Sequence, residues 1–518
     1  VAEQIVAKLD VADMCEPAEI AGPGFINLRL SEAFLARSLE AIHGDERLGI
    51  PKVSPGRRAV VDFSSPNIAK DMHVGHLRTT IVGDSIARML EFAGHEVLRI
   101  NHVGDWGTQF GMLIQFLRES QPQALKGPKN IHIADLDAFY QQAKQRFDAD
   151  KAFADAARRA VVDLQGGDPA TRAAWAYIHQ ESRLKFEQIY DLLNIHLIER
   201  GESFYNDLLP GVVEEMKKKK LAVVDEGAVC VFLDGFVGRD GTPLPMIIQK
   251  SDGGFNYDTT DLAALKYRVE RDKADWLIYV TDSRQHQHFE MLFACGRKAG
   301  WAPAGTRLDH VGYGMIMGPH DRPFRTREGG TVKLQDLLDE AISRARTIVD
   351  ENSPDLPEQQ RQAVGQAVGI GAVKYADLSH NVASDYRFSW DKMLAMDGNT
   401  APYMMYAYAR IRSIGRKGGI EYESLPGDIK IDLTSEWERK LAKRLLQYPD
   451  IFLQTCEELA PNVLTGYLFD TAQAFSHFYR ECPVLQAESE ALKLSRFRLC
   501  DIVARTIKSA LHLLGIET

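Results

Sequence analysis

The arrangement of apolar and polar residues between positions 58 and 112 predicts a strand, a helix and a second strand. Residues 59–63 form a β-branched run typical of a buried strand, and the Ser-Ser-Pro-Asn stretch at 64–67 interrupts it with turn-forming residues. From Val74 the apolar residues recur at helical spacing as far as Gly94, where we expect the helix to stop. Residues 97–100 form the second predicted strand. Two strands joined by a helix favour a parallel sheet.

The same pattern divides the rest of the chain into regions. From 399 onward, four to five amphipathic helices predict an independent bundle, and residues 332–390 are expected to be helical connectors. The first 50 residues have helical and extended segments but are too few for a core of their own. Between these ends we expect a helical stretch at 135–194, a helix ending in the lysine run 217–220, and strands at 228–233, 246–249 and 277–281.

Composition indicates a soluble globular protein of about three domains. Of the 518 residues, 45% are hydrophobic and 26% charged, and no apolar run approaches the roughly 20 residues of a membrane-spanning helix. The chain begins with Val1 rather than methionine, so we expect that part of the natural N-terminus is missing. No signal peptide is visible.

Charge and cysteine content narrow the functional classes. The net charge of -10 argues against indiscriminate binding to nucleic acid, so an RNA site would have to be a local basic surface. The six cysteines are scattered and include no Cys-x-x-Cys pair. This spacing argues against a zinc ribbon or a disulfide framework and favours free thiols in the reducing cytoplasm.

The junction between the first loop and the first helix carries His73-Val74-Gly75-His76. Two imidazoles three residues apart lie on one face of a helical turn, and a helix N-terminus favours anions. Gly75 leaves room for a ligand to approach the backbone. We therefore expect a nucleotide phosphate here, with two polar helix caps as the alternative. The spacing fits neither a His-Glu-x-x-His metalloprotease nor a P-loop.

Two other regions are expected to adjoin the same site. Ligands of open α/β sheets bind beyond the carboxyl ends of the strands, so residues 64–76, 257–261 and 282–288 could converge on one crevice. His286 and His288 are expected to line a nucleotide pocket, since we expect no cysteine or acidic cluster nearby to complete a metal site. Residues 312–330 are rich in glycine and arginine. Such a loop can neutralise a departing pyrophosphate, with a surface turn as the alternative.

Two basic features have both a functional and a structural interpretation. The lysines at 217–220 could contact an RNA acceptor arm or could form a solvated helix end. The helix after residue 400 alternates tyrosines with arginines, as in proteins that stack RNA bases and bind phosphates. Its alternative is a core stripe of tyrosines with solvated arginines.

The stretch SSPNIAKDMHVGHLR, followed by NHVGDWGTQFGMLI, resembles the HIGH-signature region of class I aminoacyl-tRNA synthetases, and more narrowly of arginyl-tRNA synthetases. The resemblance implies an α/β Rossmann-like catalytic domain with a parallel sheet, an all-α bundle and a remnant of a small α+β N-terminal domain. The implied domains are the remnant at 1–50, which contacts the tRNA corner in this family, the catalytic domain at 51–335 with insertions at about 115–200 and 205–250, a connector at 336–395 and an anticodon-binding bundle at 396–518.

The reaction implied by the resemblance joins L-arginine to tRNA(Arg) in two steps, with ATP and Mg²⁺ and through arginyl-adenylate. Formation of the adenylate is expected to require bound tRNA, and the protein is expected to be a monomer. The implied catalytic residues are His73, His76 and Lys70. Besides the histidines, the ATP-binding residues are expected to be Gly75, His288, Arg325 and Arg327.

The second signature of class I synthetases, KMSKS, is degenerate in this chain. Arg327 matches its trailing basic residue, but Thr326 replaces the second lysine. We expect Lys70, three residues before His73, to supply the missing charge.

A planar guanidinium is matched by a carboxylate that accepts it in a bidentate manner, which makes Asp62, Glu202, Asp258 and Asp261 candidates. The resemblance implies that the arginine contacts are Ser65, Pro66, Asn67, His76, Tyr257, Asp261 and Gln285, with Asp62 and Glu202 matching less closely. The expected tRNA contacts are Asn399, Thr400, Tyr403, Tyr406, Arg410 and Arg412. The rival hypotheses are a small-molecule nucleotidyltransferase, which also carries His-x-Gly-His, and a non-catalytic RNA-binding paralogue.

Overall fold

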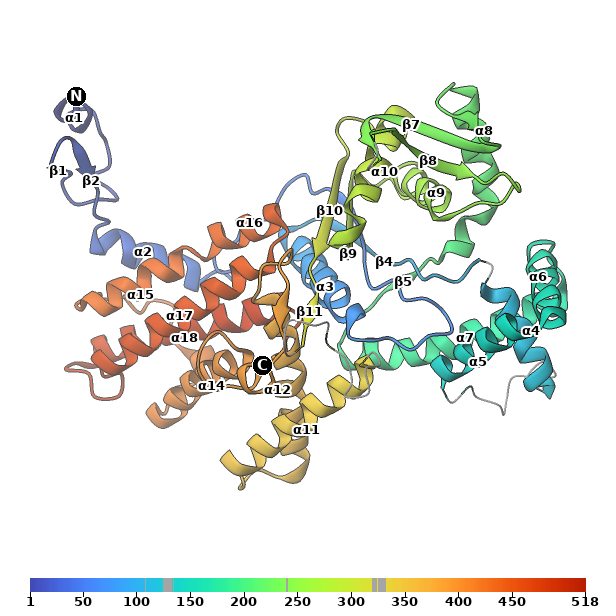
Figure 1. Cartoon of the computed structure of the whole chain (residues 1–518). Coiled ribbons are helices and arrows are strands. Elements are labelled where there is room, and N and C mark those ends of the chain that lie inside the picture. The colour runs from blue at the N-terminus through green and yellow to red at the C-terminus, as the bar shows by residue number, and fades with distance from the viewer. Residues whose placement is uncertain (108, 124–132, 134, 239–240, 319–323, 325–331) are drawn as a thin grey trace. The chain divides into compact units, whose positions relative to one another are not determined.

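The computed structural model describes residues 1–107, 109–123, 133, 135–238, 241–318, 324 and 332–518 (Figure 1). The chain forms two compact units. The sheet unit contains Pro55–Ala341 and Val382–Phe388, and the helical unit contains Val1–Ser54, Ile342–Asn381 and Ser389–Thr518. The expected N-terminal remnant and most of the connector are therefore parts of the same unit as the C-terminal bundle. No helix among the described residues is long and apolar enough to cross a membrane.

A five-stranded parallel sheet forms the centre of the sheet unit, which confirms the predicted fold class. Its order is β10-β9-β3-β4-β5. The central strand, β3, is almost wholly buried because helices and neighbouring strands surround it, as expected of a parallel sheet. The bounds are β3 Arg58–Asp62, β4 Glu96–Asn101, β5 Ile198–Glu199, β9 Trp276–Asp282 and β10 Arg307–Tyr313.

Helix α3 (Gly75–Ala93) joins β3 to β4, as the sequence pattern predicts. It ends at Gly94, whose φ of 105° lies in the left-handed region that glycine adopts without strain. A Cβ on Gly83 would lie 2.2 Å from the Phe63 ring. The absence of a side chain at Gly83 therefore lets α3 pack closely against the end of β3.

The predicted strands at 228–233 and 246–249 exist but lie outside the parallel sheet. They belong to β7 (Ala228–Val237) and β8 (Pro243–Gln249) in a separate sheet, where β7 is the middle strand and pairs antiparallel with β8 and with β6 (Val223–Asp225) (Figure 1). The helices around them are α8 (Leu209–Lys218), α9 (Tyr257–Glu270) and α10 (His286–Lys298). Short 3-10 turns, η2 (Glu202–Leu208) and η3 (Ser283–Gln285), lead into α8 and α10.

The predicted helical stretch after residue 135 is confirmed, and its helices, which lie between β4 and β5 in the chain, are called the helical insertion below. It consists of α5 (Leu136–Ala149), α6 (Lys151–Gln165) and α7 (Pro169–Leu192), preceded by α4 (Gln109–Ser120). Asp135, Asp150 and Asp168 cap the three later helices by accepting backbone N–H groups. A Cβ on Gly111 of α4 would lie 2.2 Å from the carbonyl oxygen of Ala157 on α6, so α4 and α6 pack in close contact.

After α12 (Glu358–Leu378), residues 382–388 return to the sheet unit. There β12 (Tyr386–Arg387) pairs with β11 (Ile316–Met317). The buried guanidinium of Arg78, on α3, donates to the carbonyl oxygens of Gly314 and Ser384, both at 2.8 Å. This one side chain therefore fixes the start of β11 and the returning segment to the helix that begins at the histidine motif.

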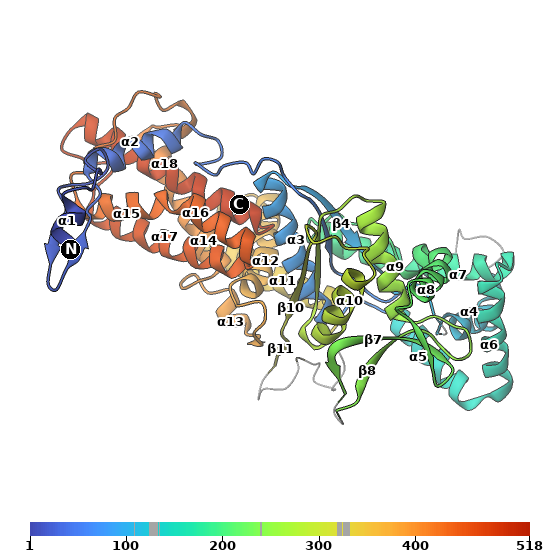
Figure 2. The same cartoon turned by 90° about the horizontal axis from the view of Figure 1, so that it is seen from above.

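The helical unit contains the predicted bundle, whose five α-helices after residue 400 lie side by side (Figure 2). The N-terminal α2 packs on α15, where Arg439 pairs with Glu32 at 2.7 Å. The bounds are α1 Ala2–Val6, β1 Glu19–Ala21, β2 Phe25–Asn27, α2 Glu32–His43, α12 Glu358–Leu378, α13 Trp390–Met393, α14 Ala401–Gly418, η5 Tyr422–Ser424, α15 Glu436–Leu446, α16 Tyr448–Glu458, α17 Pro461–Glu481 and α18 Glu490–Leu513. Helix α11 (Leu334–Asn352) begins in the sheet unit and ends in the helical unit.

Candidate active site

Both imidazoles of the histidine motif have the same tautomer, set by the backbone. The Gly75 amide donates to His73 Nδ1 at 3.0 Å, and the His73 amide donates to His76 Nδ1 at 3.1 Å. Since a neutral imidazole has one N–H, each ring carries its proton on Nε2. The ring centroids lie 4.0 Å apart. The motif therefore offers two neighbouring N–H donors to an anion.

Burial keeps these rings uncharged near neutral pH. Desolvation lowers the pKa of His73, and it lowers the pKa of His76 to about 3, where the proximity of His73 adds to the effect. The first amides of α3 are less available than the sequence pattern suggests. Those of Val74, Gly75 and His76 donate to Val332 O, His73 Nδ1 and His73 O. The side chains, together with the helix dipole, are the groups open to a ligand.

Gly75 is required by the position of His73. An added Cβ would lie 2.7 Å from Cε1 and 2.8 Å from Nδ1 of that ring. A larger residue would push the imidazole away and break its bond to the amide of residue 75.

A pocket lies directly beside this motif, within the sheet unit. It is lined by His73, Val74, Gly75, Arg78, Asp282, Arg284, Tyr313, Gly314, Met315, Ile316 and Phe324. The lining thus joins the start of α3, the end of β9 and the strand β11. This position beyond the carboxyl ends of parallel strands is where α/β sheets bind nucleotides. Of the residues expected to converge on one crevice, those at 73–75, 282 and 284 line this pocket, whereas His76 and Gln285 do not. His288 is absent from this lining.

His288 instead belongs to an acidic cluster on α9 and α10. Its Nε2 lies 2.7 Å from Asp261 Oδ2, and its Nδ1 lies 3.2 Å from Asp258 Oδ1. The two carboxylates raise the pKa of His288 to about 9 against the opposing effect of burial. Tyr257, the first residue of α9, is 62% exposed, and its ring centroid lies 5.3 Å from that of His288.

Glu202 completes the acidic cluster from the start of η2. Burial, together with the charges of Asp261 and Asp105, raises the pKa of Glu202 to about 7. Asp105 fixes this turn, since its carboxylate accepts from the Ser203 amide at 2.8 Å and from the Ser203 hydroxyl at 2.6 Å. A guanidinium placed here would relieve the repulsion among these carboxylates.

Asp62 differs from the other acidic candidates because its partner is part of the chain. Its Oδ2 lies 2.7 Å from the guanidinium of the buried Arg268, and its Oδ1 accepts from the Ser65 hydroxyl at 3.1 Å. Asp62 is itself buried, so a second guanidinium would have to displace Arg268. The geometry gives Asp62 a structural role beneath the loop rather than one in contact with a ligand.

The loop after β3 holds the candidates Ser65, Pro66 and Asn67, and its backbone has an unusual conformation. Ser64, Ser65 and Ala69 have φ values of 72°, 49° and 65°, which non-glycine residues rarely adopt. Asn101 stabilises the loop by accepting the Ser65 amide at 2.9 Å. Pro66 and Asn67 lie against Gly104, where a Cβ would meet the Asn67 side-chain oxygen at 2.1 Å. The strain indicates a functional loop.

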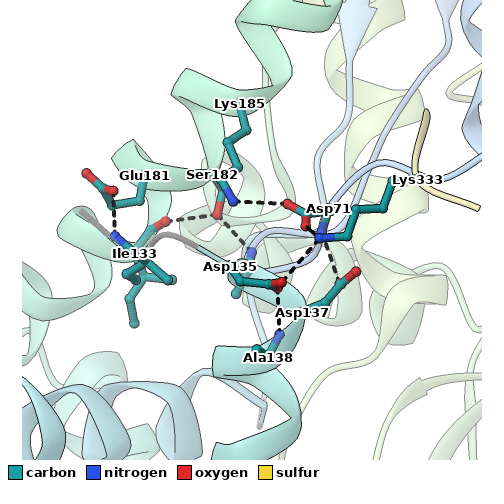
Figure 3. Close-up of polar contacts among 11 residues, drawn as sticks. Asp71, Ile133, Asp135, Asp137, Ala138, Glu181, Ser182, Lys185 and Lys333 are labelled. Carbon is teal, nitrogen blue, oxygen red and sulfur yellow. Dashed lines mark hydrogen bonds and ion pairs between the residues drawn. The ribbon is translucent and has the colours of Figure 1, made fainter. Parts of the chain in front are cut away.

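The helical insertion holds the next part of this loop (Figure 3). The Ala69 amide donates to the Ser182 hydroxyl at 2.9 Å, and the Asp71 amide donates to Asp137 Oδ1 at 3.1 Å. The Asp71 carboxylate pairs with Lys333 at 2.6 Å and with Lys185 at 3.3 Å.

The Lys333 ammonium also lies 3.3 Å from the Asp135 carboxylate. The residues on either side of Lys333 form backbone hydrogen bonds to the histidine motif and the residue before it. Val74 donates to Val332 and Leu334 donates to Met72. The histidine motif, the insertion and the residues that open α11 therefore form one connected network.

Lys70 lies within this network and points to the insertion. Its ammonium is 4.4 Å from the centroid of the Tyr140 ring on α5, a cation–π contact. Gln285 closes η3 and directly precedes α10. Arg325, Thr326 and Arg327 lie outside the described residues.

The candidate RNA-binding residues lie at the start and along the outer side of α14. The Thr400 hydroxyl caps the helix, and the Asn399 side chain accepts from Tyr375 at 2.8 Å. Arg410 lies over the Tyr479 ring at 4.5 Å, and Arg412 pairs with Glu423 at 2.9 Å. The core stripe of α14 consists of Met404, Ala407, Ile411 and Ile414, whereas Tyr403 and Tyr408 are half-buried and Tyr406 is exposed.

Sequence reasoning missed several supporting residues. Arg78, Asn101, Arg268, Lys333 and Asp71 all position the site from outside its signature. Their partners lie up to 306 positions away in the chain, so no local pattern marks them. Arg268 lies near the end of α9, a helix with several other charged residues, so its charge did not single it out.

Three family patterns cover most of the chain. Residues 39–390 match the catalytic domain of class I (R) tRNA synthetases, residues 404–518 match the DALR anticodon binding domain, and residues 1–30 match the arginyl tRNA synthetase N terminal domain.

Relatives and solved structures agree with these matches. Arginine–tRNA ligases of a Synechococcus and a Nostoc species are 56% and 55% identical, each aligned over 100% of this chain and 89% of the relative. The arginyl-tRNA synthetase structure of Plasmodium falciparum has a TM-score of 0.87 at 34% identity, covering 100% of this chain and 87% of that one. That of Thermus thermophilus has a TM-score of 0.82 at 25% identity, covering 100% and 90%. By its sequence, its fold and its relatives, the chain belongs to the arginyl-tRNA synthetase family of class I aminoacyl-tRNA synthetases.

Proposed function

We propose that this protein ligates L-arginine to tRNA(Arg) at the expense of ATP. The arginine carboxylate attacks the α-phosphate, the bond to the β-phosphate breaks, and pyrophosphate leaves. A ribose hydroxyl at the tRNA 3′ end then takes the arginyl group, and AMP leaves. The observation that carries the proposal is the pocket beside the histidine motif, with its paired N–H donors, in a chain 56% identical to a ligase of that activity.

His73 and His76 donate from Nε2 to phosphate oxygens as charge builds during attack. Because both rings are neutral, they stabilise that charge by hydrogen bonding and do not transfer protons. Preorganisation by two backbone amides means that little rearrangement is needed when ATP binds.

The arginine side chain binds at the acidic cluster. Asp261 and Glu202 accept the guanidinium, and Tyr257 covers it from the exposed side. Ser65, Pro66, Asn67, His76 and Gln285 contact the arginine at the strained loop and at the start of α10. Asp62 is left out of this set because Arg268 already occupies its carboxylate.

Lys70, Arg325 and Arg327 supply positive charge to the triphosphate, and Mg²⁺ arrives with ATP. Among the described residues, no group of three or more histidine, cysteine or acidic side chains could hold a metal ion, so phosphate oxygens and water would be its main ligands. For Lys70 to reach a phosphate, its ammonium must leave the Tyr140 ring.

The proposed role of Lys70 is tested by Lys70→Ala. The substitution is expected to lower ATP–pyrophosphate exchange about tenfold or more, because one phosphate-facing cation is lost. Exchange near the wild-type rate would assign Lys70 to the Tyr140 contact alone.

The tRNA binds through Asn399, Thr400, Tyr403, Tyr406, Arg410 and Arg412. The half-buried and exposed tyrosines offer ring faces for base stacking, and the two arginines lie on the same helix. Adenylate formation requires bound tRNA, and the active protein is a cytoplasmic monomer.

Aminoacylation of total tRNA with each of the twenty amino acids tests this function. Arginine alone should be attached, and exchange of pyrophosphate into ATP should fall to background after RNase treatment. Exchange that is unaffected by RNase would contradict tRNA dependence. Nucleotide transfer to a small molecule without tRNA charging would favour the nucleotidyltransferase alternative.

A further inference from the structure

The imidazole of His288 is held between two carboxylates, one at each ring nitrogen. Nε2 lies 2.7 Å from Asp261 and Nδ1 lies 3.2 Å from Asp258. A carboxylate oxygen only accepts, and a neutral imidazole has a single N–H. Both contacts are hydrogen bonds only if the ring is an imidazolium. The cluster therefore already holds a cation supplied by the chain itself.

The groups around the ring leave the two aspartates as its main electrostatic partners. On α9, Tyr257 packs edge-on against it. On β10, His310 has a pKa lowered to about 4 by burial and by the neighbouring histidines, so it brings no positive charge. On α10 itself, His286 lies 3.4 Å from Glu290.

Besides His288, Asp261 also interacts with His102 and Glu202. Its Oδ1 lies 3.8 Å from Nε2 of His102, and Glu202 acts on it through charge repulsion. The side chains of Asp261 and His288 are 21% and 19% exposed, so a ligand can reach them. An incoming guanidinium meets a carboxylate whose Oδ2 is already occupied.

We propose that arginine binding at this cluster replaces the charge of His288. The guanidinium takes over Asp261, and the proton on His288 Nε2 passes to solvent. The ring stays on Asp258 through its Nδ1–H, and Nε2 becomes an acceptor for a guanidinium N–H. One positive charge enters and one leaves, so the net charge of the cluster is unchanged. The inference rests on the arginine site proposed above.

The physical reason is repulsion between cations on one partly buried carboxylate. Two positive charges within about 4 Å destabilise each other, and loss of a proton from imidazole is the least costly escape. Guanidinium stays charged at every accessible pH, and imidazole does not. Binding coupled to proton release becomes tighter as pH rises, by up to about tenfold per pH unit for one proton.

Proton release can be counted by calorimetry with the full chain and L-arginine alone. At pH 8.0, the slope of binding enthalpy against buffer ionisation enthalpy in HEPES, tricine and Tris gives the number of protons. That pH lies above the pKa of Glu202, about 7, and below that of His288, about 9. We expect release of about one proton. No release, or uptake, would overturn the inference.

His288→Gln is the test variant, since it keeps a neutral polar group on α10. It should bind arginine at pH 7 at least as tightly as wild type, and at pH 8.0 it should release almost no proton. A purely structural role would weaken binding and leave the proton count unchanged. His286→Gln, two residues earlier, is the matched control and should still release about one proton.

The pH dependence of KM gives an independent measurement if the binding heat is small. In tRNA charging assays between pH 7.5 and 8.5, log KM for arginine should fall with rising pH in wild type and stay flat in His288→Gln. A flat profile in wild type overturns the inference while leaving the function intact. Failure to charge tRNA with arginine would instead remove the proposed function.

Discussion

Gly75 determines where the first catalytic imidazole lies. Its Cα faces the His73 ring so closely that any Cβ would overlap two ring atoms. The sequence suggested that this glycine leaves room for a ligand. In the structure the His73 ring takes the place that a Cβ would occupy, and Gly75 also lines the pocket.

Replacement of Gly75 by alanine should therefore impair chemistry more than folding. Displacement of the imidazole by about 1 Å is expected to lower the rate of ATP–pyrophosphate exchange about 10- to 100-fold. Gly211→Ala is the matched control, because it too lies near a helix start and a Cβ there meets nothing within 4 Å. Equal exchange rates for the two variants would contradict the proposed position of His73.

Because of Glu202, the pH profile of kcat/KM for arginine should have an acid limb near neutral pH. Its raised pKa of about 7 means that it gains a proton as pH falls below that value and loses its attraction for guanidinium. We expect kcat/KM for arginine to fall between pH 7.5 and 6 in wild type. Glu202→Gln should have a lower kcat/KM throughout, with a flatter profile over this range. A full acid limb in that variant would assign the ionisation to another group.

At the scale of elements, helices and strands that have a local apolar pattern can be predicted from the sequence, and those that lack one cannot. β3, α3 and β4 are local, since each has its own apolar period and Gly94 marks a boundary. β10 was not predicted because its seven residues are all half-buried and four of them, such as Arg307 and Asp309, break the apolar run.

β7 and β8 illustrate a second limit of predicting the fold from the sequence. Their apolar runs predict strands, yet nothing in those runs says which sheet they join. The same holds for the site. The histidines and Asp261 were found because local patterns carry them. Lys333 and Arg268 act through partners that only the fold brings near.

The contact between Asp71 and Lys333 should couple two elements that flank the site. We expect Asp71→Asn and Lys333→Met each to slow ATP–pyrophosphate exchange, and the double variant to be little worse than either. The coupling energy in kcat/KM is expected to be about 1 kcal/mol. The exposed pair Lys144–Asp148 on α5 serves as control and should show no effect. Additive losses for Asp71 and Lys333 would mean that they act independently.

At the scale of the whole molecule, the chain contributes three separate segments to the helical unit. The first segment is held by the last helices. Arg505 donates to the His43 and Asp45 carbonyl oxygens, both at 2.6 Å, and Arg439 pairs with Glu32. Residues 1–54 therefore depend on the C-terminal bundle for their packing, while the sheet unit has a core of its own.

Truncation after residue 390 should separate these dependences. The shortened chain keeps β12 and the whole sheet unit but lacks α14–α18. Limited trypsin digestion followed by mass spectrometry should show rapid cleavage within residues 1–54 and 342–381 and slow cleavage within the described helices and strands of 55–341. Protection of residues 1–54 equal to that in the full chain would contradict their dependence on the bundle.

The contact between His43 and Arg505 also has a consequence during synthesis, because the two residues are 462 positions apart. At about 5–20 residues per second, a ribosome takes roughly 20–90 s to deliver the second partner after the first has emerged. The apolar side of α2, including Leu35 and Leu39, has no surface to cover it until α15 has also been synthesised, because α2 packs on that helix. The nascent chain thus exposes the apolar side of α2 to chaperones and to neighbouring polysomal chains until the helices that cover it have been synthesised.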